Sequence, residues 1–581
     1  MSKEKLYSLI IFSVLILHIA ASYYSVGWYN PDEQSCVLEY LLYKIDKFSD
    51  PCFIYLNDQN EIYEGIKIRS WSQPFIYFII TKFLFIFYKL DGFTLTFILK
   101  LFSSLIGFLS MIIFFRSSKS YELTKSTEKI YFLTFFLFWF YPFLHSRTSS
   151  ENLSIAFLFL SISLCIKIMN NKNYLLYFLM GILMGLTFIF RYHLGISIFF
   201  ILLWILIYSK TKFQIRVFNL FFTSLGIFSI ILLELLINIW GYGGLFNFNQ
   251  ISFPAYGIFN YSSSNNFFSN EMWTTDPFWN YLELSLTKFY PPISILIIVS
   301  MFYFWVKGRY NLLTWATLPF FIIHSLIPHK ELRYIFPVLA FSPYFISFFY
   351  EKYLSYRELD KNKYIKSIII FLFLLNILGL FFVSFTPQKP QLKVLNYIYK
   401  NYDNINEIYY FNNLDNIDED SLNPFNLKNL TTNYYFRFTN IELFKINKNE
   451  KIRFLSGYSG FCPKTICYDI ERKYFKTNNL EYHYFKKNSS IPSLKIYLRD
   501  PDNNEIVDFN NLNFYMDLNN LNFYMNGKKL YILTKDYEIY NKLLDAKKCS
   551  KIISSYPNFI SKISKNRINQ RLTNYGFFQC L

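Results

Sequence analysis

The sequence lacks the signatures of several common protein classes. It contains no GxxxxGK loop of the kind that cradles nucleotide phosphates. Its seven cysteines include one CxxxxC pair, Cys462 and Cys467, but no histidine spacing supports a zinc site. The formal net charge is +18, yet no basic block stands alone. The cations occur in loops beside apolar runs, which indicates membrane topology and anionic headgroups and no nucleic acid.

The chain also lacks clear processing signals. The apolar run at residues 7–26 follows Lys3 and Lys5, but no small-x-small cleavage pattern clearly follows it. We therefore expect a signal anchor that remains as the first membrane span. No retention or lipidation motif stands at the C-terminus.

Hydrophobic and aromatic residues, in contrast, are abundant. Of the 581 residues, 53% are hydrophobic and 22% are aromatic, with 69 Phe and 50 Tyr. A soluble protein with so much aromatic surface would need a very large core. Long apolar runs separated by short polar loops instead indicate an all-α polytopic membrane protein.

Twelve apolar runs approach the ~20 residues that a membrane span requires. They lie at residues 7–26, 73–90, 95–115, 130–146, 152–169, 174–190, 194–209, 216–239, 286–306, 312–327, 334–350 and 365–386. If all twelve crossed, the short basic loops would lie outside, against the positive-inside rule. If 73–90 only enters the interface, every short basic loop moves inside. We therefore predict eleven spans, with these loops on the outer face: 27–72, 146–151, 191–193, 240–285 and 328–333.

The polar tail is predicted to form a second domain. We assign residues 1–387 to the membrane domain and 388–581 to a small α/β domain on the outer face. Its pattern predicts a helix at 392–399 and strands at 408–411, 496–498 and 529–533. Cys462, Cys467, Cys549 and Cys580 are candidates for disulfides if this domain faces an oxidising compartment.

One segment between two apolar runs concentrates ionisable residues. It reads HSLIPHKELRYIFP over residues 324–337 and holds His329, Lys330, Glu331 and Arg333 within five positions. Ionisable side chains at the edge of hydrocarbon are costly and usually face a site or a water-filled cavity. The alternative is a loop whose cations anchor at lipid headgroups.

The order of residues in this segment resembles a motif of a known enzyme family. It is similar to the HKE-x-R-F/Y-x-x-P segment of the dolichyl-phosphate-mannose-dependent mannosyltransferases, glycosyltransferase family 22. That family includes the mannosyltransferases of lipid-linked oligosaccharide and GPI-anchor assembly. The resemblance implies the GT-C fold and transfer of mannose from a polyprenyl-phosphate-mannose donor to a glycan or glycolipid acceptor, with inversion. It implies a lipid-phosphate sugar as co-substrate, with no further cofactor and no required metal.

The first outer loop extends the resemblance. It begins Trp-Tyr-Asn-Pro-Asp-Glu at residues 28–33 and ends with Glu64, Arg69, Ser70 and Pro74, similar to the family's PDE and E-x-x-x-x-RS-x-x-x-P elements. Transfer to a hydroxyl needs a base that takes its proton. The resemblance therefore assigns the catalytic carboxylate to Asp32, with Glu33 second. Capping of a helix that begins at Pro31 is the structural alternative.

Cations in four segments are candidates to bind the substrate. The resemblance and the charge that develops on a phosphate leaving group together favour His329, Lys330 and Arg333, with Glu331 orienting Arg333 or Lys330. Arg69, Arg147 in RTSSEN and Arg191 in the G-x-x-x-x-x-R segment are further candidates. Snorkelling to the interface is the alternative for Arg147.

Two tryptophans have two equally weighted interpretations. Trp273 and Trp279 resemble a G-x-x-PW-x-x-Y element, with Asp276 where a neutral residue or His is usual. They are either interfacial anchors or groups that stack on sugar rings or pack a prenyl chain. Asn238 stands where the family has Asp in D-S-x-x-YG, which places a charge-based role there in doubt.

Two other function classes remain open. A GT-C enzyme that uses another lipid-linked sugar would need the same charges in a different pocket. A transporter should show internal repeats and Gly/Pro-broken spans in paired positions, and none is convincing here. We expect an integral membrane protein, of the endoplasmic reticulum if eukaryotic and of the inner membrane if bacterial.

Overall fold

A computed structural model gives the fold of the chain. It describes residues 3–45, 54–56, 62–64, 69–88, 90–169, 172–242, 276–327, 329–400, 407–412, 482–483, 493–498, 516–517, 522–523, 530–534, 540, 543–544, 549–557 and 575–580. The chain divides into two compact units. The first comprises Met1–Tyr24, Asn30–Lys89 and Thr94–Phe385, and the second Ser25–Tyr29, Leu90–Phe93 and Thr386–Leu581.

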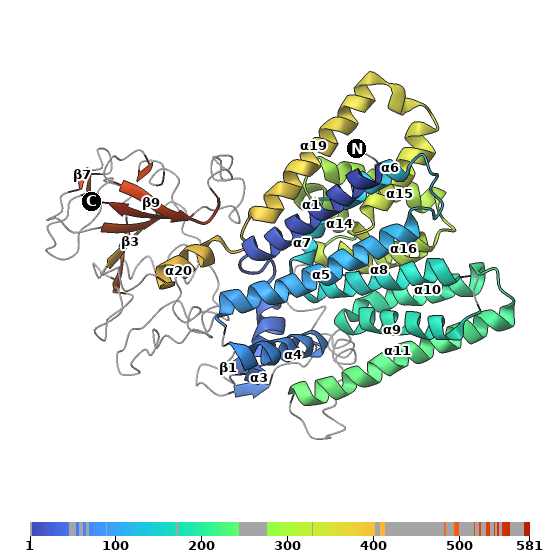
Figure 1. Ribbon diagram of the computed structural model, residues 1–581, viewed down its shortest axis with the longest axis horizontal. Coiled ribbons are helices and arrows are strands. Elements are labelled where there is room, and N and C mark those ends of the chain that lie inside the picture. The colour runs from blue at the N-terminus through green and yellow to red at the C-terminus, as the bar shows by residue number, and fades with distance from the viewer. Residues whose placement is uncertain are drawn as a thin grey trace. The chain divides into compact units, whose positions relative to one another are not determined.

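The first unit is a bundle of apolar helices (Figure 1). Its helices are α1 (Lys3–Tyr24), α2 (Pro31–Glu33), α3 (Glu39–Ile45), α4 (Ser72–Phe87), α5 (Gly92–Ser118), α6 (Glu128–Phe136), α7 (Phe140–His145), α8 (Ser150–Ile168), α9 (Tyr174–Phe190), α10 (Gly195–Tyr208), α11 (Phe213–Tyr242), α14 (Asn280–Lys288), α15 (Ile293–Lys307), α16 (Leu312–Leu326), α17 (Phe336–Leu339), α18 (Ser342–Phe349) and α19 (Lys363–Phe385). Two short strands, β1 (Ile54–Leu56) and β2 (Ile62–Glu64), pair as antiparallel neighbours. The predicted all-α membrane architecture is therefore confirmed for this unit.

Helix length and composition identify the candidate membrane spans. Five described helices, α1, α5, α8, α11 and α19, are long and apolar enough to cross a membrane. Two bent pairs, α15 with α16 and the helices from Leu332 to Ser355, raise that number to seven, and α4, α9 and α10 are shorter apolar helices. The chain is thus an integral membrane protein, and the count of eleven spans stays a prediction. Helix α4 is 16 residues long, similar in length to α9 and α10, and the expectation that 73–90 does not cross stays a prediction.

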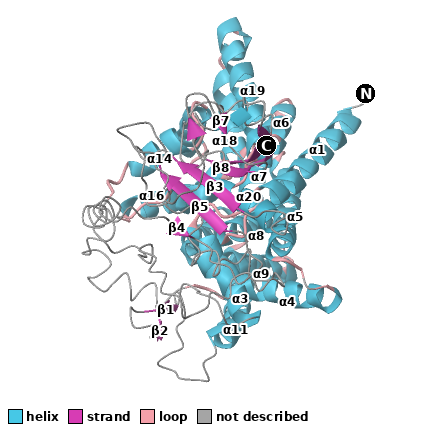
Figure 2. Cartoon of the chain, turned by 90° about the vertical axis from the view of Figure 1, so that its left-hand side faces the viewer, coloured by secondary structure: helices cyan, strands magenta, loops and turns pink. Residues whose placement is uncertain are grey.

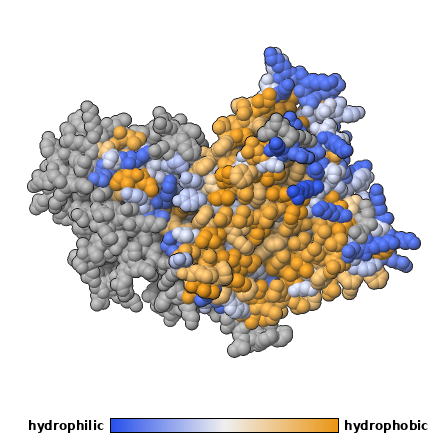
Figure 3. All heavy atoms as spheres, in the orientation of Figure 1, coloured by the Kyte–Doolittle hydropathy of each residue, from blue (hydrophilic) through white to orange (hydrophobic). Residues whose placement is uncertain are grey.

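The basic loops lie along one edge of the helical unit. In Figure 1 the connections from α5 to α6, from α10 to α11 and into α19 are at the right-hand edge. Figure 3 shows hydrophilic residues gathered at that edge, with an apolar surface covering the helices beside it. Lys119, Lys210 and Lys363 belong to these connections. Their common side fits the positive-inside assignment.

Small residues let α9 and α11 approach closely. A Cβ atom on Gly181 would lie 2.1 Å from the carbonyl oxygen of Thr223, and one on Gly226 would lie 2.3 Å from that of Phe178. Backbone carbonyls cannot move aside as flexible side chains do. Glycine therefore sets the separation of these two helices, as small residues do in membrane bundles generally.

The second unit contains the predicted α/β domain. Its sheet has the order β4 (Tyr482–His483), β5 (Ser493–Leu498), β3 (Glu407–Asn412), β8 (Leu530–Thr534), β10 (Gly576–Cys580) and β9 (Cys549–Ser554). β3 is parallel to β5 and β8, whereas β10 is antiparallel to β8 and β9, and Figure 2 shows β5, β3 and β8 side by side. Strands β6 (Met516–Asp517) and β7 (Asn522–Phe523) form a separate pair, and helix α20 spans Pro390–Lys400. The predicted helix and all three predicted strands are confirmed.

In the part of the chain that the structure describes, Cys36 and Cys549 are each disulfide-bonded. Cys549, a predicted candidate, forms a disulfide and lies opposite Cys580 in the β9–β10 register. Cys36 in the first unit also forms a disulfide, which the sequence pattern did not indicate. The predicted candidates Cys462 and Cys467 lie outside the described residues. Cys165 is free and buried, as expected for a cysteine in an apolar run.

The glycine contacts generate a stability prediction. Gly181→Ala and Gly226→Ala should each lower the free energy of unfolding by about 1–3 kcal/mol, because overpacking outweighs the better helix propensity of alanine. Thermal unfolding of the purified protein measures the effect. Gly195→Ala is the control, since a Cβ there would meet only the Phe188 ring at 3.1 Å. Unfolding temperatures equal to that of the control would contradict this account of helix packing.

Topology is tested by chemical labelling. Lys119→Cys places a thiol in the basic connection between α5 and α6, which the eleven-span arrangement locates inside. A membrane-impermeant maleimide applied from outside should leave it unlabelled until the membrane is opened. Labelling of the intact membrane would refute that arrangement.

Candidate functional site

A cavity of about 450 Å³ lies at the end of the bundle where α8 begins and α9 ends. Five segments line it, within residues 32–37, 69–74, 149–151, 188–193 and 333–334. Its volume is within the range of roughly 300–1,000 Å³ that is common for small-molecule sites. The polar loops predicted for the outer face therefore contribute to one concave site.

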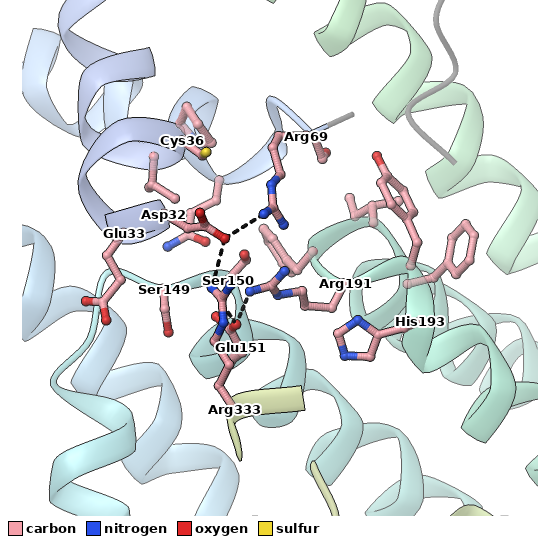
Figure 4. Close-up of a pocket in the computed structure, with 18 of the residues that line it drawn as sticks. Asp32, Glu33, Cys36, Arg69, Ser149, Ser150, Glu151, Arg191, His193 and Arg333 are labelled. Carbon is pink, nitrogen blue, oxygen red and sulfur yellow. Dashed lines mark hydrogen bonds and ion pairs between the residues drawn. The ribbon is translucent and has the colours of Figure 1, made fainter. Parts of the chain in front are cut away.

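Asp32 lies at the centre of the charged side chains in this cavity. Helix α2 begins at Pro31, as predicted, and the Asn30 side chain accepts a hydrogen bond from the Asp32 amide at 3.0 Å. The Oδ2 atom of Asp32 accepts from Arg69 at 2.5 Å and from Arg333 at 2.8 Å, as Figure 4 shows. The first outer loop and the segment three hundred residues later thus meet in one ion-pair cluster.

The charge state of Asp32 follows from these contacts. Burial alone would raise the pKa of Asp32, because it penalises the charged form. Arg69, Arg333 and Arg191 outweigh burial and lower this pKa to about 2. The carboxylate is therefore ionised and strongly held at neutral pH.

Glu331 orients Arg333 toward Asp32. Its two carboxylate oxygens accept from Arg333 Nε at 2.6 Å and Nη2 at 3.1 Å, a bidentate fork that fixes the guanidinium plane. Asn30 Nδ2 also donates to Glu331 at 3.1 Å, and His329 Nε2 lies 3.3 Å from it. Of the two partners that the sequence left open for Glu331, the structure pairs it with Arg333.

Several predicted residues do not line the cavity. The Lys330 ammonium donates to the carbonyl oxygens of Ile327 at 2.7 Å and Asp276 at 3.0 Å, and its amide donates to the Asp276 carboxylate. Arg147 donates from Nε to the Phe143 carbonyl and stacks 4.2 Å from the Phe143 ring. Nearby backbone carbonyls thus accept hydrogen bonds from both cations, and a role of either residue in substrate binding stays a prediction. His329 does not line the cavity either, and its ring lies 6.2 Å from that of Tyr334, which does.

The two adjacent carboxylates of the first loop point in different directions. Glu33 lines the cavity but is 2% exposed and turns away from the arginines (Figure 4). Its Oε1 atom accepts from the Asn30 amide at 3.4 Å, a weak version of the capping role. Lys100 of α5 interacts with it electrostatically. The helix that follows buries Val37 and Leu41 inside the protein.

Trp279 does not line the cavity. Trp279 is 53% exposed and stands at the start of α14, next to exposed Phe278. Trp273 lies outside the described residues. The choice between anchor and stacking roles stays open for both.

Sequence reasoning missed Glu151, a second carboxylate of the cavity. It lies in the first turn of α8, pairs with Arg191 and is 3.6 Å from Arg333. Arg191, a predicted candidate cation, is thus part of the charged cluster. Its partner Glu151 was not among the predicted residues. A glutamate that follows Arg147 in an outer loop and begins an apolar helix was the available signal.

The C-terminal end of α11 supports the arginine of the first loop. Tyr242 donates to the Arg69 carbonyl oxygen at 2.6 Å, and Asn238 Oδ1 accepts from the Trp71 amide at 2.8 Å. A Cβ atom on Gly241 would lie 2.1 Å from the Trp71 ring. Asn238 therefore acts through a hydrogen bond that needs no charge, which resolves the doubt raised by the missing aspartate.

Comparison with known proteins gives a family match. A family model described as Alg9-like mannosyltransferase family matches residues 10–419. No curated protein sequence matches the chain. Solved structures with a similar fold include apo ArnT from Cupriavidus metallidurans, at 11% identity and TM-score 0.38 over 60% of each chain. Another is the apo oligosaccharyltransferase from Archaeoglobus fulgidus, at 12% identity and TM-score 0.42 over 70% of this chain and 62% of that one. The chain thus spans less than two thirds of these proteins.

The low pKa of Asp32 predicts a pH-dependent stability. With a folded pKa of about 2 and an unfolded value of 3.8, the ion pairs contribute on the order of 2 kcal/mol, fully present above about pH 4. This contribution is lost as the pH falls toward 2. The unfolding free energy of the wild type minus that of Asp32→Asn should therefore be constant between pH 5 and 7 and decrease below pH 4. A difference in unfolding free energy that stays constant down to pH 3 would contradict the stabilising ion pairs of Asp32 with Arg69 and Arg333.

Proposed function

The chain belongs to the Alg9-like mannosyltransferase family, and from this premise we propose that it moves mannose from a polyprenyl-phosphate-mannose donor to a hydroxyl of a glycolipid or glycan. Membership makes the protein a membrane glycosyltransferase. The donor, the acceptor and the residues that act on them are the content of the proposal.

The observation that carries the proposal is one carboxylate held between two arginines in the cavity. Asp32 is within 3 Å of both Arg69 and Arg333. In the proposed reaction the acceptor oxygen attacks the anomeric carbon from the face opposite the phosphate, so the configuration inverts. The new carbon–oxygen bond forms as the bond to the phosphate oxygen breaks, and Asp32 takes the hydroxyl proton. The bonding pair leaves with the polyprenyl phosphate.

The arginines have the chemistry that the leaving group requires. Negative charge develops on the phosphate as it departs, and fixed guanidinium donors in a site with little water stabilise that charge best. Arg191 and Arg333 are both less than one tenth exposed. An apolar surface covers the face of the bundle seen in Figure 3, which suits a donor whose prenyl chain stays in the membrane.

The same residues support transfer without a metal cofactor. Asp32, Glu151 and Glu331 each pair with a guanidinium group. In the proposed reaction these cations serve the electrostatic role toward the phosphate.

The disulfides support a site on the oxidising side of the membrane. Cys36 is disulfide-bonded and belongs to the cavity lining. Structural disulfides form in the lumen of the endoplasmic reticulum or in the periplasm, and rarely in the cytosol. We therefore assign the reaction to the lumenal face in a eukaryote or the periplasmic face in a bacterium.

Substitution of the two adjacent carboxylates tests the proposal. Purified Asp32→Asn, given labelled polyprenyl-phosphate-mannose and a panel of mannosyl lipid acceptors, should lose at least about 100-fold in turnover, as expected for a missing general base. Glu33→Gln should lose less, because its carboxylate faces away from the arginines. Glu358→Gln, in a highly exposed ion pair with Lys361, is the control for charge removal. Substantial turnover by Asp32→Asn would remove Asp32 from the mechanism.

A further inference from the structure

A histidine that the sequence analysis did not assign to the site lines the cavity. His193 lies in the short 3₁₀ helix η2 (Tyr192–Leu194), between α9 and α10, and belongs to the cavity lining. In Figure 4 its ring projects from the chain toward the side of the cavity that holds Arg191 and Glu151. The reaction proposed above gives this side chain no part.

The His193 ring has hydrogen-bonding capacity that the described residues do not use. Neither ring nitrogen forms a hydrogen bond with a described residue, and Nε2 is buried. A neutral imidazole carries one N–H donor and one acceptor nitrogen. A polar group that leaves water without gaining a partner is destabilising. Because His193 lines the cavity and is partly exposed, a ligand in the cavity is the group that is placed to supply the missing partner.

Packing does not explain a histidine at this position. The centroid of its ring lies 5.6 Å from that of Phe320, 5.2 Å from that of His324 and 6.3 Å from that of Tyr334. A phenylalanine would fill the same aromatic surroundings without burying a polar nitrogen. His324 does not use the His193 nitrogens, since its own Nδ1 donates to the Phe320 carbonyl at 2.9 Å. The imidazole nitrogens therefore need another explanation.

The surroundings of His193 keep its ring neutral. Burial and the neighbouring His324 lower the pKa of His193, and three guanidinium groups lower it further. These groups belong to Arg191, Arg333 and Arg69. At pH 7 the ring is therefore an uncharged hydrogen-bonding group within electrostatic reach of the whole arginine cluster.

A phosphate is the ligand that these neighbours favour. Each of the three arginines is already paired with a carboxylate, so an anion that binds to them has to share their donors. An N–H of His193 is a donor that an anion reaches without breaking an ion pair. An anion beside the ring also removes the reason for its neutrality, because it favours the charged imidazolium.

We propose that His193 is a phosphate-binding residue, and that its ring N–H donates to an oxygen of the lipid phosphate at the arginine cluster. The inference rests on the proposed function. Negative charge grows on the phosphate as the bond to the sugar breaks, and a hydrogen bond to a more highly charged oxygen is stronger. His193 therefore binds the departing phosphate more tightly than the phosphate of the donor.

Binding of polyprenyl phosphate to the purified protein tests the proposal. His193→Phe keeps the aromatic packing, removes both ring nitrogens and should weaken this binding at least about tenfold, as expected for a lost hydrogen bond to a charged group. Polyprenol, which lacks the phosphate, should bind the wild type and the variant equally. Undiminished affinity of His193→Phe for polyprenyl phosphate would overturn the proposal, and so would an equal loss for polyprenol.

Two amide variants identify the donor nitrogen. The side-chain NH₂ group of asparagine takes roughly the place of His Nδ1, and that of glutamine roughly the place of His Nε2. Either His193→Asn or His193→Gln should therefore recover part of the affinity that His193→Phe loses. Recovery by neither variant would overturn a hydrogen bond as the source of the affinity.

Two further ligands separate the lipid phosphate from other occupants. Inorganic phosphate has the same oxygens and no prenyl chain. If only its affinity depended on His193, the site would belong to a free phosphate and the lipid assignment would be overturned. If the affinity for polyprenyl-phosphate-mannose depended on His193 while that for polyprenyl phosphate did not, the ring would contact a sugar hydroxyl, which also overturns the proposal.

A matched control separates phosphate binding from folding. Tyr177→Phe removes a buried hydroxyl of α9 that donates to the Ile168 carbonyl at 2.8 Å and lies outside the cavity lining. It should lower the unfolding temperature and leave the affinity for polyprenyl phosphate at the wild-type value. An equal loss of affinity in this control would trace the effect to the fold and overturn the proposal.

These binding measurements are independent of mannose transfer. A wild type that binds polyprenyl phosphate through His193 but transfers no mannose would refute the proposed function alone. A wild type that transfers mannose, while His193→Phe keeps full affinity for polyprenyl phosphate, would overturn the present inference alone.

Discussion

The ion pair between Asp32 and Arg333 is the interaction on which the rest of the site depends. It joins residues that are 301 positions apart in the chain, and a parallel bond from Asn30 to Glu331 joins the same two segments. Through these contacts, the first loop and the segment before α17 form one cluster of charged side chains. Without them, each would be an isolated polar loop at the end of an apolar bundle. The fold therefore serves chiefly to bring two distant loops to one point.

Helix α11 positions the first loop for its contacts in the cavity. Its last two turns hold the backbone around Arg69 through Asn238 and Tyr242, and its buried Glu234 accepts a hydrogen bond from Tyr192. The close packing of α9 on α11 fixes the helix that ends at Arg191 against the same scaffold. Two of the three arginines in the cavity are thus set by one helix that contributes no residue to the lining.

Much of the fold was accessible from the sequence because it follows from periodicity. Apolar runs predict membrane helices, and the alternation in the tail predicts β3, β5 and β8 at the positions observed. The meeting of Asp32 with Arg333 was also accessible, since a family resemblance links their two segments.

The directions of individual side chains were not accessible. Lys330 belongs to the predicted segment, but its ammonium group donates to the backbone carbonyl oxygens of Asp276 and Ile327. Glu151 and Glu234 were missed because a lone carboxylate gains meaning only from the partner that folding brings to it. Sequence identifies which groups are ionisable, whereas pairing depends on contacts across hundreds of residues.

The charge balance of the ion-pair cluster has a consequence for the proposed reaction. Three guanidinium groups face three carboxylates, namely Arg69, Arg191 and Arg333 with Asp32, Glu151 and Glu331. A phosphate that enters this neutral cluster has to take an arginine from a carboxylate already bound to it. If the phosphate takes an arginine from Asp32, the pKa of Asp32 rises, because the arginines are what lowers it. Binding of the proposed lipid donor would therefore make Asp32 a stronger base. In the proposed reaction, an Asp32 that stays paired with its arginines is a weak base, so water at the cavity is activated less than an acceptor that arrives after the donor.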